Sequence, residues 1–313
     1  MAPFRGNAYV ARTRPNSSVH AMHKDSDFMS DAANVPRKPS DDEVDVFGLS
    51  HTGKVRTENQ DHYLMATIHK RVNVVGTNID TGRRIPGEEQ RLAYLAMVAD
   101  GVGGGVGGAD ASATALEAIM QYVDNSVAVY YCGETDKDKF MELLKGAAMR
   151  AHEAVVARRE ETGARGTMAT TLTMYIGMWP TYYLLQVGDS RYYVWRAGKL
   201  MQVTRDQTVA QELVDRGVLD ASAAARTPMA HVLSSAIGSE TKPIVTRLES
   251  DWTNVHLLCS DGLTKHVSDE RIAQVLSEMT SAKQACEQLL QDALDDGGTD
   301  NITIVIGRAV PRV

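Results

Sequence analysis

The chain has 313 residues, of which 43% are hydrophobic and 23% are charged, and its formal net charge is −7. This composition is typical of a globular protein with a sizeable core, and the length suits one large domain with a tail. The acidic balance argues against a nucleic-acid-binding surface. No apolar run approaches the length of a spanning helix, so we expect no membrane insertion. The three scattered cysteines show neither zinc-ligand spacing nor a disulfide framework, which favours a reducing, cytoplasmic location.

The first 44 residues differ from the rest of the chain. They are rich in Ser, Asn, Pro and basic residues and show no apolar periodicity. We interpret residues 1–44 as a flexible N-terminal tail and residues 45–313 as one folded domain. The first 24 residues contain no acid, which leaves a transit peptide as an alternative, but they show no clear amphipathic pattern.

Periodicity predicts the elements of the domain in chain order. Strands are expected at 45–50, 62–67 and 92–99, followed by helices at 109–124 and 136–160. Four strands follow at 169–177, 181–187, 191–196 and 200–203, and then a short helix at 209–216. The last elements are strands at 244–248 and 254–259, helices at 268–277 and 282–294, and a strand at 301–307. Strand-rich blocks separated by helix pairs predict an α+β fold of antiparallel sheets covered by helices.

Two segments between these elements stand out. Residues 69–91 are polar and rich in turn residues, and we interpret them as a hairpin-like excursion before the strand at 92–99. Residues 205–243 are mixed in character and contain Ala-, Ser- and Thr-rich sequence. This second segment is the best candidate for a mobile insertion beside a functional site.

Four carboxylates share one local setting at the ends of predicted core strands: Asp100, Asp189, Asp261 and Asp300. A single Asp-Gly pair is usually only a turn. Four acids at the mouths of core strands repel one another, so they require cations between them. Oxygen ligands of this kind suit Mg²⁺ or Mn²⁺ rather than zinc. Two such ions close together would activate a water molecule and neutralise a phosphoryl group.

Five motifs that contain these acids occur in a fixed order along the chain: Arg56-x-x-Asn59-Gln60-Asp61, Asp100-Gly101-x-Gly103-Gly104, Gly188-Asp189-Ser190-Arg191, Ser260-Asp261-Gly262 and Gly298-x-Asp300-Asn301. Over about residues 45–308, this ordered set resembles the metal-dependent serine/threonine protein phosphatases of the PPM (type 2C) family, and the bacterial members most closely in style. The resemblance implies a four-layer α-β-β-α sandwich of two antiparallel sheets flanked by helices.

The resemblance also implies a set of metal ligands. Asp100 would bridge two catalytic ions, Mn²⁺ or Mg²⁺, and the carbonyl oxygen of Gly101 would bind one of them. Asp261 and Asp300 would hold the other ion. Asp189 resembles the residue that, together with the Asp261 position, binds a third metal in bacterial members.

The resemblance implies a reaction as well. Arg56 would grip the substrate phosphate, and a metal-bound hydroxide would attack phosphorus directly. Gln60, Asp61 and Asn301 are candidates for positions beside the metal ligands, and residues 205–243 would form a flap that shapes substrate access. The implied substrates are proteins that carry phosphoserine or phosphothreonine, the products of a serine/threonine kinase. We expect a monomer.

The sequence departs from the family pattern at a few positions. Gln60 stands where many members have glutamate, so the metal nearest to it would be bound by one negative charge fewer. Val102 stands where eukaryotic members carry a histidine proposed as the general acid, and bacterial members lack this histidine too, so no residue is assigned to that role. Gly105 replaces a histidine and Ala169 a glycine, and we expect both changes to be tolerated.

Two alternatives belong to other functional classes. The spacing Gly103-x-Gly105-x-x-Gly108, after a strand and before a helix, formally matches a dinucleotide-binding fingerprint. Asp100 at the strand end would repel a pyrophosphate, and the βαβ alternation of that fold is absent. The other alternative is a catalytically silent, phosphatase-like module with a binding or regulatory role. Retention of the costly acids argues against a silent module.

Overall fold

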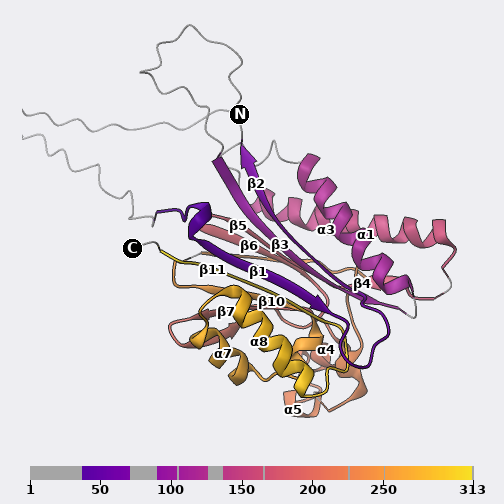
Figure 1. Cartoon of the computed structure of the whole chain (residues 1–313). Helices are drawn as coiled ribbons and strands as arrows, with labels where there is room; N and C mark the ends of the chain where they lie inside the picture. Colours follow the sequence, from indigo (N-terminus) through magenta and orange to yellow (C-terminus); the bar gives the residue numbers. More distant parts are fainter. Residues whose placement is uncertain are drawn as a thin grey trace, which may run out of the picture. The chain divides into compact units, whose positions relative to one another are not determined.

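The computed structural model describes residues 37–70, 90–103, 106–125, 137–164, 166–224, 226–249 and 251–311 (Figure 1). The tail up to residue 36, most of the predicted polar excursion (71–89), Gly104, Gly105 and Cys132 lie outside the described residues.

Two antiparallel sheets form the centre of the fold. The first has the order β1-β11-β10-β7-β8, with β1 at Val44–His51, β11 at Ile302–Ala309, β10 at Val255–Cys259, β7 at Arg191–Arg196 and β8 at Lys199–Gln202. The second has the order β2-β3-β5-β6-β9, with β2 at Asp61–Lys70, β3 at Gln90–Val102, β5 at Leu172–Met178, β6 at Thr181–Val187 and β9 at Ile244–Glu249. The short strand β4 (Ala169–Thr170) pairs with the end of β3.

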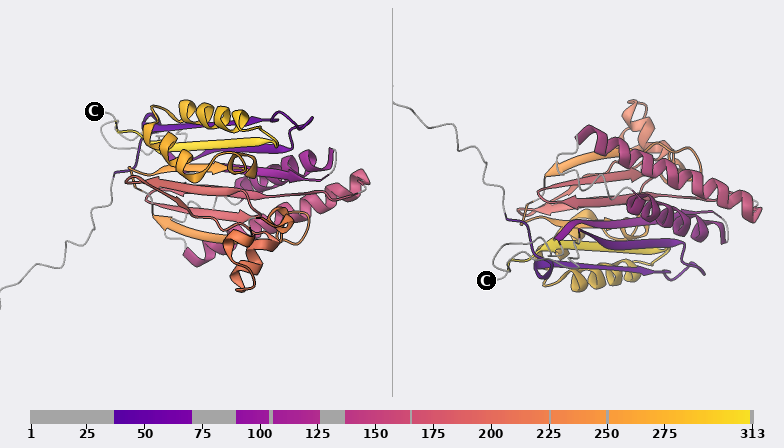
Figure 2. Two further views of the ribbon diagram at one scale, coloured as in Figure 1. Left: turned by 90° about the horizontal axis from the view of Figure 1, so that it is seen from below. Right: turned by 90° about the horizontal axis from the view of Figure 1, so that it is seen from above.

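Helices cover the outer face of each sheet (Figure 2). The pair α1 (Val106–Asn125) and α3 (Lys137–Thr162) shares a core with the second sheet. The pair α7 (Asp269–Glu278) and α8 (Ala282–Asp295) shares a core with the first sheet. The predicted four-layer α-β-β-α sandwich is therefore confirmed. Among the described residues, no helix is long and apolar enough to cross a membrane.

Strand β3 shows why its sequence is an almost continuous apolar run. Leu95, Met97 and Ala99 face the core shared with α1 and α3, whereas Ala96 and Val98 belong to the core between the two sheets. Successive side chains of a strand point to opposite faces, so a central strand of this sandwich buries both sets. Its end therefore reaches the site from a rigid, fully packed position.

The expected segment 205–243 forms a helical connection between the edge strands of the two sheets. It contains α4 at Val209–Asp215, α5 at Ala221–Ala224 and a 3₁₀ turn at Pro228–His231. Isolated bridges join Thr208 to Leu233 and Thr170 to Ile237, so the segment returns along its own start and contacts β4. The other predicted helices and strands that fall on described residues are present, with ends shifted by a few residues and the strand at 169–177 divided into β4 and β5.

Residues before the predicted boundary at residue 44 contact the folded domain. The indole Nε1 of Trp252 donates a hydrogen bond of 2.7 Å to the carbonyl of Arg37, and the Arg37 guanidinium lies over the Trp252 ring. The Arg91 guanidinium pairs with Asp41 and also donates to the carbonyl of Pro39. Residues 37–43 thus belong to the folded domain, held by contacts that are distant in sequence.

A partly buried histidine at the interface between the sheets gives a pH prediction. His256 lies beside a cavity of about 340 Å³ and shares a hydrogen bond of 2.6 Å with the hydroxyl of Tyr192. Burial lowers the pKa of His256 to about 4. Between about pH 4 and about pH 6.5, His256 is protonated in the unfolded chain but stays neutral in the folded chain. His256 therefore lowers the free energy of unfolding as the pH falls through its pKa in the unfolded chain, about 6.5.

We expect this effect to lower the free energy of unfolding by about 1 kcal/mol between pH 7.5 and pH 5.5. Urea unfolding of the wild type and of His256→Gln at both pH values measures it. The substituted protein should lose less stability than the wild type over this range. An equal loss in both proteins would contradict the assignment.

Candidate active site

The acids singled out from the sequence meet at one end of the two sheets. Strand pairing sets Asp61 at the start of β2 directly opposite Asp100 near the end of β3. Asp189 follows β6, Asp261 follows β10 at the start of α6 (Asp261–Thr264), and Asp300 precedes β11. A pocket of about 840 Å³ is lined by Asp100, Asp189, Asp261 and Asp300, together with Arg56 and Gln60.

The backbone of Asp100 is held in place by Thr170, the last residue of β4, and by Thr171, which follows it. The hydroxyl of Thr170 and the amide of Thr171 each donate a hydrogen bond of 2.9 Å to the carbonyl of Asp100. The amide of Asp100 donates to the hydroxyl of Thr171 at 3.0 Å. Burial raises the pKa of Asp100 well above its ordinary value, and the charges of Asp61 and Asp261 raise it further. The carboxylate is therefore fixed where its negative charge is costly.

Asp61 is the most deeply buried of these acids, with 3% of its surface exposed. Its Oδ2 accepts hydrogen bonds from the hydroxyls of Ser260, at 2.6 Å, and Thr303, at 2.8 Å. Burial raises the pKa of Asp61 to about 6, although these two hydrogen bonds oppose the shift. Asp61 thereby links the start of β2 in one sheet to β11 and to the residue that follows β10 in the other sheet.

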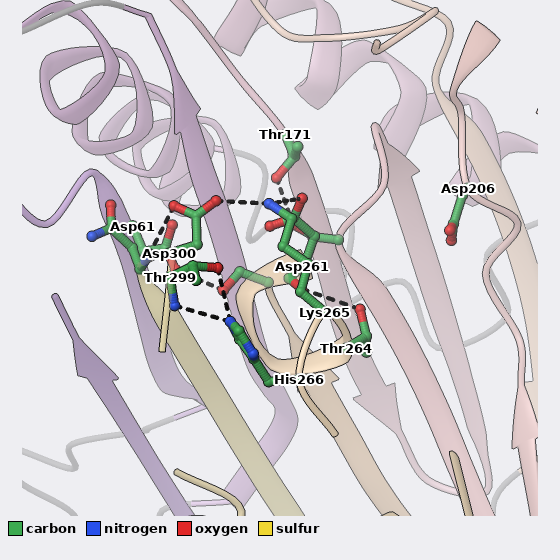
Figure 3. A network of polar contacts seen from close by, with 12 residues as sticks. Asp61, Thr171, Asp206, Asp261, Thr264, Lys265, His266, Thr299 and Asp300 are labelled. Carbon is green, nitrogen blue, oxygen red and sulfur yellow. Dashed lines mark hydrogen bonds and ion pairs between the residues drawn. The ribbon is translucent and has the colours of Figure 1, made fainter. Parts of the chain in front are cut away.

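Asp261 and Asp300 are held together by a lysine that the sequence analysis did not single out. The Nζ atom of Lys265 lies 2.7 Å from Oδ2 of Asp261 and 2.7 Å from Oδ2 of Asp300. Figure 3 shows Lys265 beside these two acids, whereas Asp206 lies well apart. Partial burial lowers the pKa of Lys265, but the charge and hydrogen bond of Asp261 and those of Asp300 outweigh it, so its pKa is raised.

Arg56 reaches the same cluster from the loop between β1 and β2. Its Nε lies 2.8 Å from Oδ1 of Asp300, and its Nη2 donates to Oδ2 of the same carboxylate at 3.0 Å. Burial raises the pKa of Asp300, but the hydrogen bonds from Lys265 and Arg56 outweigh it and keep that pKa below its ordinary value. Half of the Arg56 side chain, 52%, remains exposed in the pocket.

Asn301 fastens the loop that carries Arg56 and Gln60. Its side-chain amide donates hydrogen bonds of 2.9 Å to the carbonyls of Thr52 and Glu58, and its Oδ1 accepts from the amide of Gln60 at 2.8 Å. The carbonyl of Gln60 in turn accepts a hydrogen bond of 3.1 Å from the amide of Gly101. In this structure Asn301 and the backbone of Gln60 connect the arginine loop to β3 and β11.

Two glycines allow backbone segments to approach closely at the site. A Cβ atom at Gly101 would lie 2.2 Å from the carbonyl oxygen of Gly108 and 2.6 Å from that of Gln60. A Cβ atom at Gly262 would lie 1.9 Å from the carbonyl oxygen of Asn301. The glycines that follow Asp100 and Asp261 are therefore required by packing, because any side chain would clash with these backbone oxygens.

Asp189 lines the same pocket as Asp261, and both residues also line a neighbouring cavity. Gly188 before it adopts a φ of +100°, a conformation that favours glycine. Burial, together with the charges of Asp261 and Asp206, raises the pKa of Asp189 to about 7. Asp206 itself is bound by the guanidinium of Arg191, with Nη2 and Oδ2 2.7 Å apart.

The donor chemistry of the pocket fits a hard divalent cation. The side chains that line it include the carboxylates of Asp100, Asp189, Asp261 and Asp300 and the amides of Gln60 and Asn301. The buried Oδ1 of Asp261 has no hydrogen-bond partner within the described residues. These are the oxygen ligands that Mg²⁺ and Mn²⁺ prefer. In the part of the chain that the structure describes, no group of three or more His, Cys, Asp or Glu side chains is already arranged around one metal position. Lys265 and Arg56 instead occupy the oxygens of Asp300 and one oxygen of Asp261.

Comparison with known proteins identifies the family. A family model described as "Protein phosphatase 2C" matches residues 86–296. The chain belongs to the protein phosphatase 2C family. The serine/threonine protein phosphatase PstP of Mycobacterium tuberculosis is 34% identical over 220 residues, which are 70% of this chain and 41% of that protein. The chain thus spans less than half the length of this curated relative.

Other relatives agree with the family assignment. The serine/threonine phosphatase stp of Listeria welshimeri is 28% identical over 214 residues, covering 68% of this chain and 83% of that protein. The crystal structure of the M. tuberculosis phosphatase PstP/Ppp superposes with a TM-score of 0.69 and 28% identity over 86% of this chain and 99% of that chain. A structure of the PstP catalytic domain in complex with two manganese ions superposes with a TM-score of 0.65, at 28% identity and with the same coverage.

The cost of gathering these acids gives a prediction about stability. We expect Asp100→Asn to raise the melting temperature of the phosphatase 2C domain in EDTA, because the amide removes a buried charge repelled by Asp61 and Asp261. Each kcal/mol of relieved repulsion corresponds to a shift of about 2–4 °C in a domain of this size. Asp206→Asn is the matched control, because it removes a carboxylate that is paired with Arg191, and it should lower the melting temperature. A decrease with Asp100→Asn would contradict this account of the cluster.

Proposed function

We propose that this chain hydrolyses phosphoserine and phosphothreonine in proteins, with two Mn²⁺ or Mg²⁺ ions as cofactors. The observation that carries the proposal is the convergence of Asp100, Asp261 and Asp300 with Arg56 in one pocket of about 840 Å³. The family assignment supports the reaction class. The two manganese ions reported for the PstP catalytic domain support the cofactors.

In this proposal the acidic residues of the site bind the metal ions. Asp100, the carbonyl of Gly101, Asp261 and Asp300 would hold the two ions, and Asp189 with Asp261 a third. The bound ions supply a Lewis acid that activates water and neutralises charge on the phosphoryl group. Asp61, fixed by Ser260 and Thr303, maintains the negative potential behind Asp100.

Arg56 is the candidate phosphate-binding residue. Its half-exposed side chain lines the pocket, and the planar set of donors on its guanidinium matches the oxygens of a phosphate. The pair with Asp300 orients the guanidinium before substrate arrives. This geometry supports substrate positioning by Arg56, whereas no described side chain is assigned to protonate the leaving group.

We propose partners, an oligomeric state and a location for the chain that agree with this reaction. Phosphorylated proteins would be the partners, as products of a serine/threonine kinase, and the chain would act as a monomer. The cytoplasmic location proposed from the sequence is consistent with Cys259 and Cys286, which are both free and buried. The connection at 205–243 contributes Val232, Ser235 and Lys242 to the pocket wall, which supports its proposed role in substrate access.

Hydrolysis assays test the proposed activity. The wild type should release phosphate from p-nitrophenyl phosphate and from a phosphothreonine peptide with Mn²⁺, and EDTA should abolish the turnover. Asp261→Ala should lower kcat/KM by more than about a hundredfold, since it removes a proposed metal ligand. Activity that survives both EDTA and this substitution would rule out the metal mechanism. Absence of turnover with any metal would favour the silent, phosphatase-like module.

A second assay tests the role of Arg56. Arg56→Ala should raise KM for the phosphothreonine peptide by about tenfold or more, because one charge-assisted contact to phosphate is lost. The far-ultraviolet circular dichroism spectrum should not change. Arg150→Ala, which removes an exposed arginine paired with Glu153 on α3, is the control and should leave KM as it is. An Arg56→Ala protein with the wild-type KM would exclude Arg56 from phosphate binding.

A further inference from the structure

Lys265 occupies a position between two proposed metal ligands. It lies one helical turn after Asp261 in the sequence, so its side chain returns over the start of α6 toward that acid. Its Nζ atom is 2.7 Å from Asp261 and 2.7 Å from Asp300, two residues that come from different strand ends. The side chains of the three residues are 27%, 20% and 16% exposed, so this contact is partly shielded from water.

The oxygens of Asp300 show how fully the cations occupy this acid. Oδ2 is shared by Lys265, at 2.7 Å, and Nη2 of Arg56, at 3.0 Å. Oδ1 accepts from Nε of Arg56, at 2.8 Å, and from the amide of Asn301, at 2.9 Å. A carboxylate with both oxygens engaged in this way presents no free oxygen to a divalent ion. Metal binding at Asp300 therefore requires at least one of these contacts to break.

Asp261 shows the complementary pattern. Its Oδ2 contacts Lys265, whereas its Oδ1 is buried and has no hydrogen-bond partner within the described residues. A buried oxygen without a partner is costly, and a cation in the pocket would satisfy it. One oxygen of Asp261, Oδ1, is thus available to a metal ion, whereas the other, Oδ2, contacts the ammonium of Lys265.

We propose that Lys265 is an intramolecular competitor of the metal at Asp261 and Asp300, and that it sets the metal concentration at which the site is loaded. This inference rests on the proposed function, because it takes these two acids as metal ligands. In the metal-free protein the ammonium neutralises the repulsion between the two carboxylates. It must leave before both carboxylates can turn to a divalent ion.

The displaced ammonium has a place to go. Lys265 lines both the pocket of about 840 Å³ and a neighbouring cavity of about 330 Å³ on the side of Asp189 and Asp206. Its long, unbranched side chain can turn from one to the other without movement of the backbone. Displacement of Lys265 is therefore a side-chain rearrangement within the folded domain.

Population arithmetic gives the size of the effect. If the metal-free protein holds Lys265 in the bridging position about ten times as often as elsewhere, the apparent affinity for the metal falls about tenfold. Removal of the ammonium should raise the apparent affinity for the metal by the same factor. It also leaves Asp261 and Asp300 unneutralised in the metal-free protein, which should lower its stability.

Titration of the metal-free, full-length protein with Mn²⁺ tests the proposal, with free Mn²⁺ followed by electron paramagnetic resonance. Lys265→Met keeps the unbranched side chain and removes the charge, and it should lower the Mn²⁺ dissociation constant about tenfold or more. Lys242→Met is the matched control. Lys242 lines the same pocket but pairs with Glu240, at 2.9 Å, so its removal tests the general effect of charge. This control should shift the constant less than about threefold.

Lys265→Arg is the second variant, and it keeps the proposal testable if Lys265→Met does not fold. A guanidinium holds carboxylates at least as well as an ammonium, so Lys265→Arg should bind Mn²⁺ no more tightly than the wild type. Thermal unfolding in EDTA gives an independent measurement, in which Lys265→Met should melt below the wild type and gain more from saturating Mn²⁺.

The outcomes separate this inference from the proposed function. Equal Mn²⁺ affinity in the wild type and Lys265→Met overturns the inference alone. An equal gain in Lys242→Met also overturns it, because the effect would then be one of general charge. Tighter Mn²⁺ binding by Lys265→Arg than by the wild type contradicts it too. Absence of Mn²⁺ binding in every protein overturns both the inference and the metal-dependent function.

Discussion

The acids at one end of the sandwich repel one another, and the fold has to offset this repulsion to hold them together. Burial and mutual repulsion raise the pKa values of Asp100, Asp189 and Asp61 together. Such a cluster persists only if the surrounding fold is stable enough to hold it. The fold meets this requirement with a fully packed central strand, β3, and with cores on both faces of each sheet. Packing in the cores of the four layers thus offsets the repulsion among the acids at the ends of the strands.

Three kinds of partner hold the acids in place. Threonine hydroxyl and amide groups fix the backbone of Asp100, and the hydroxyls of Ser260 and Thr303 hold the side chain of Asp61. Both sets lie on core strands or beside them, so their positions follow from sheet pairing. The side chains of Asp261 and Asp300 depend instead on Lys265 and Arg56, whose long side chains can move. The sheets therefore hold Asp100 and Asp61 rigidly, whereas Asp261 and Asp300 are paired with two cationic side chains that can move.

The sequence was sufficient for most of the fold and for the acids of the site. Periods of two and of three to four residues located the strands and helices, because one-sided or two-sided burial leaves a direct pattern in the chain. Strand ends are marked by the change from apolar to polar residues, so acids at those ends could be recognised as a group. The order of strands in each sheet and the contacts of residues 37–43 with Arg91 and Trp252 were not predictable in this way. They depend on pairings between segments far apart in the chain, which local patterns do not encode.

The position of Lys265 between two acids of the site was not predictable from the sequence. Its spacing of four residues from Asp261 was visible, and this spacing brings two side chains together on a helix. Only the structure shows that Asp300, from the start of β11, reaches the same ammonium. A lysine beside one acid is an ordinary ion pair of small energetic value. A lysine between two acids that repel each other neutralises both, and its removal changes the affinity of the pair for any other cation. The functional meaning of Lys265 therefore arises from the convergence of two strand ends, not from either of the motifs that contain these acids.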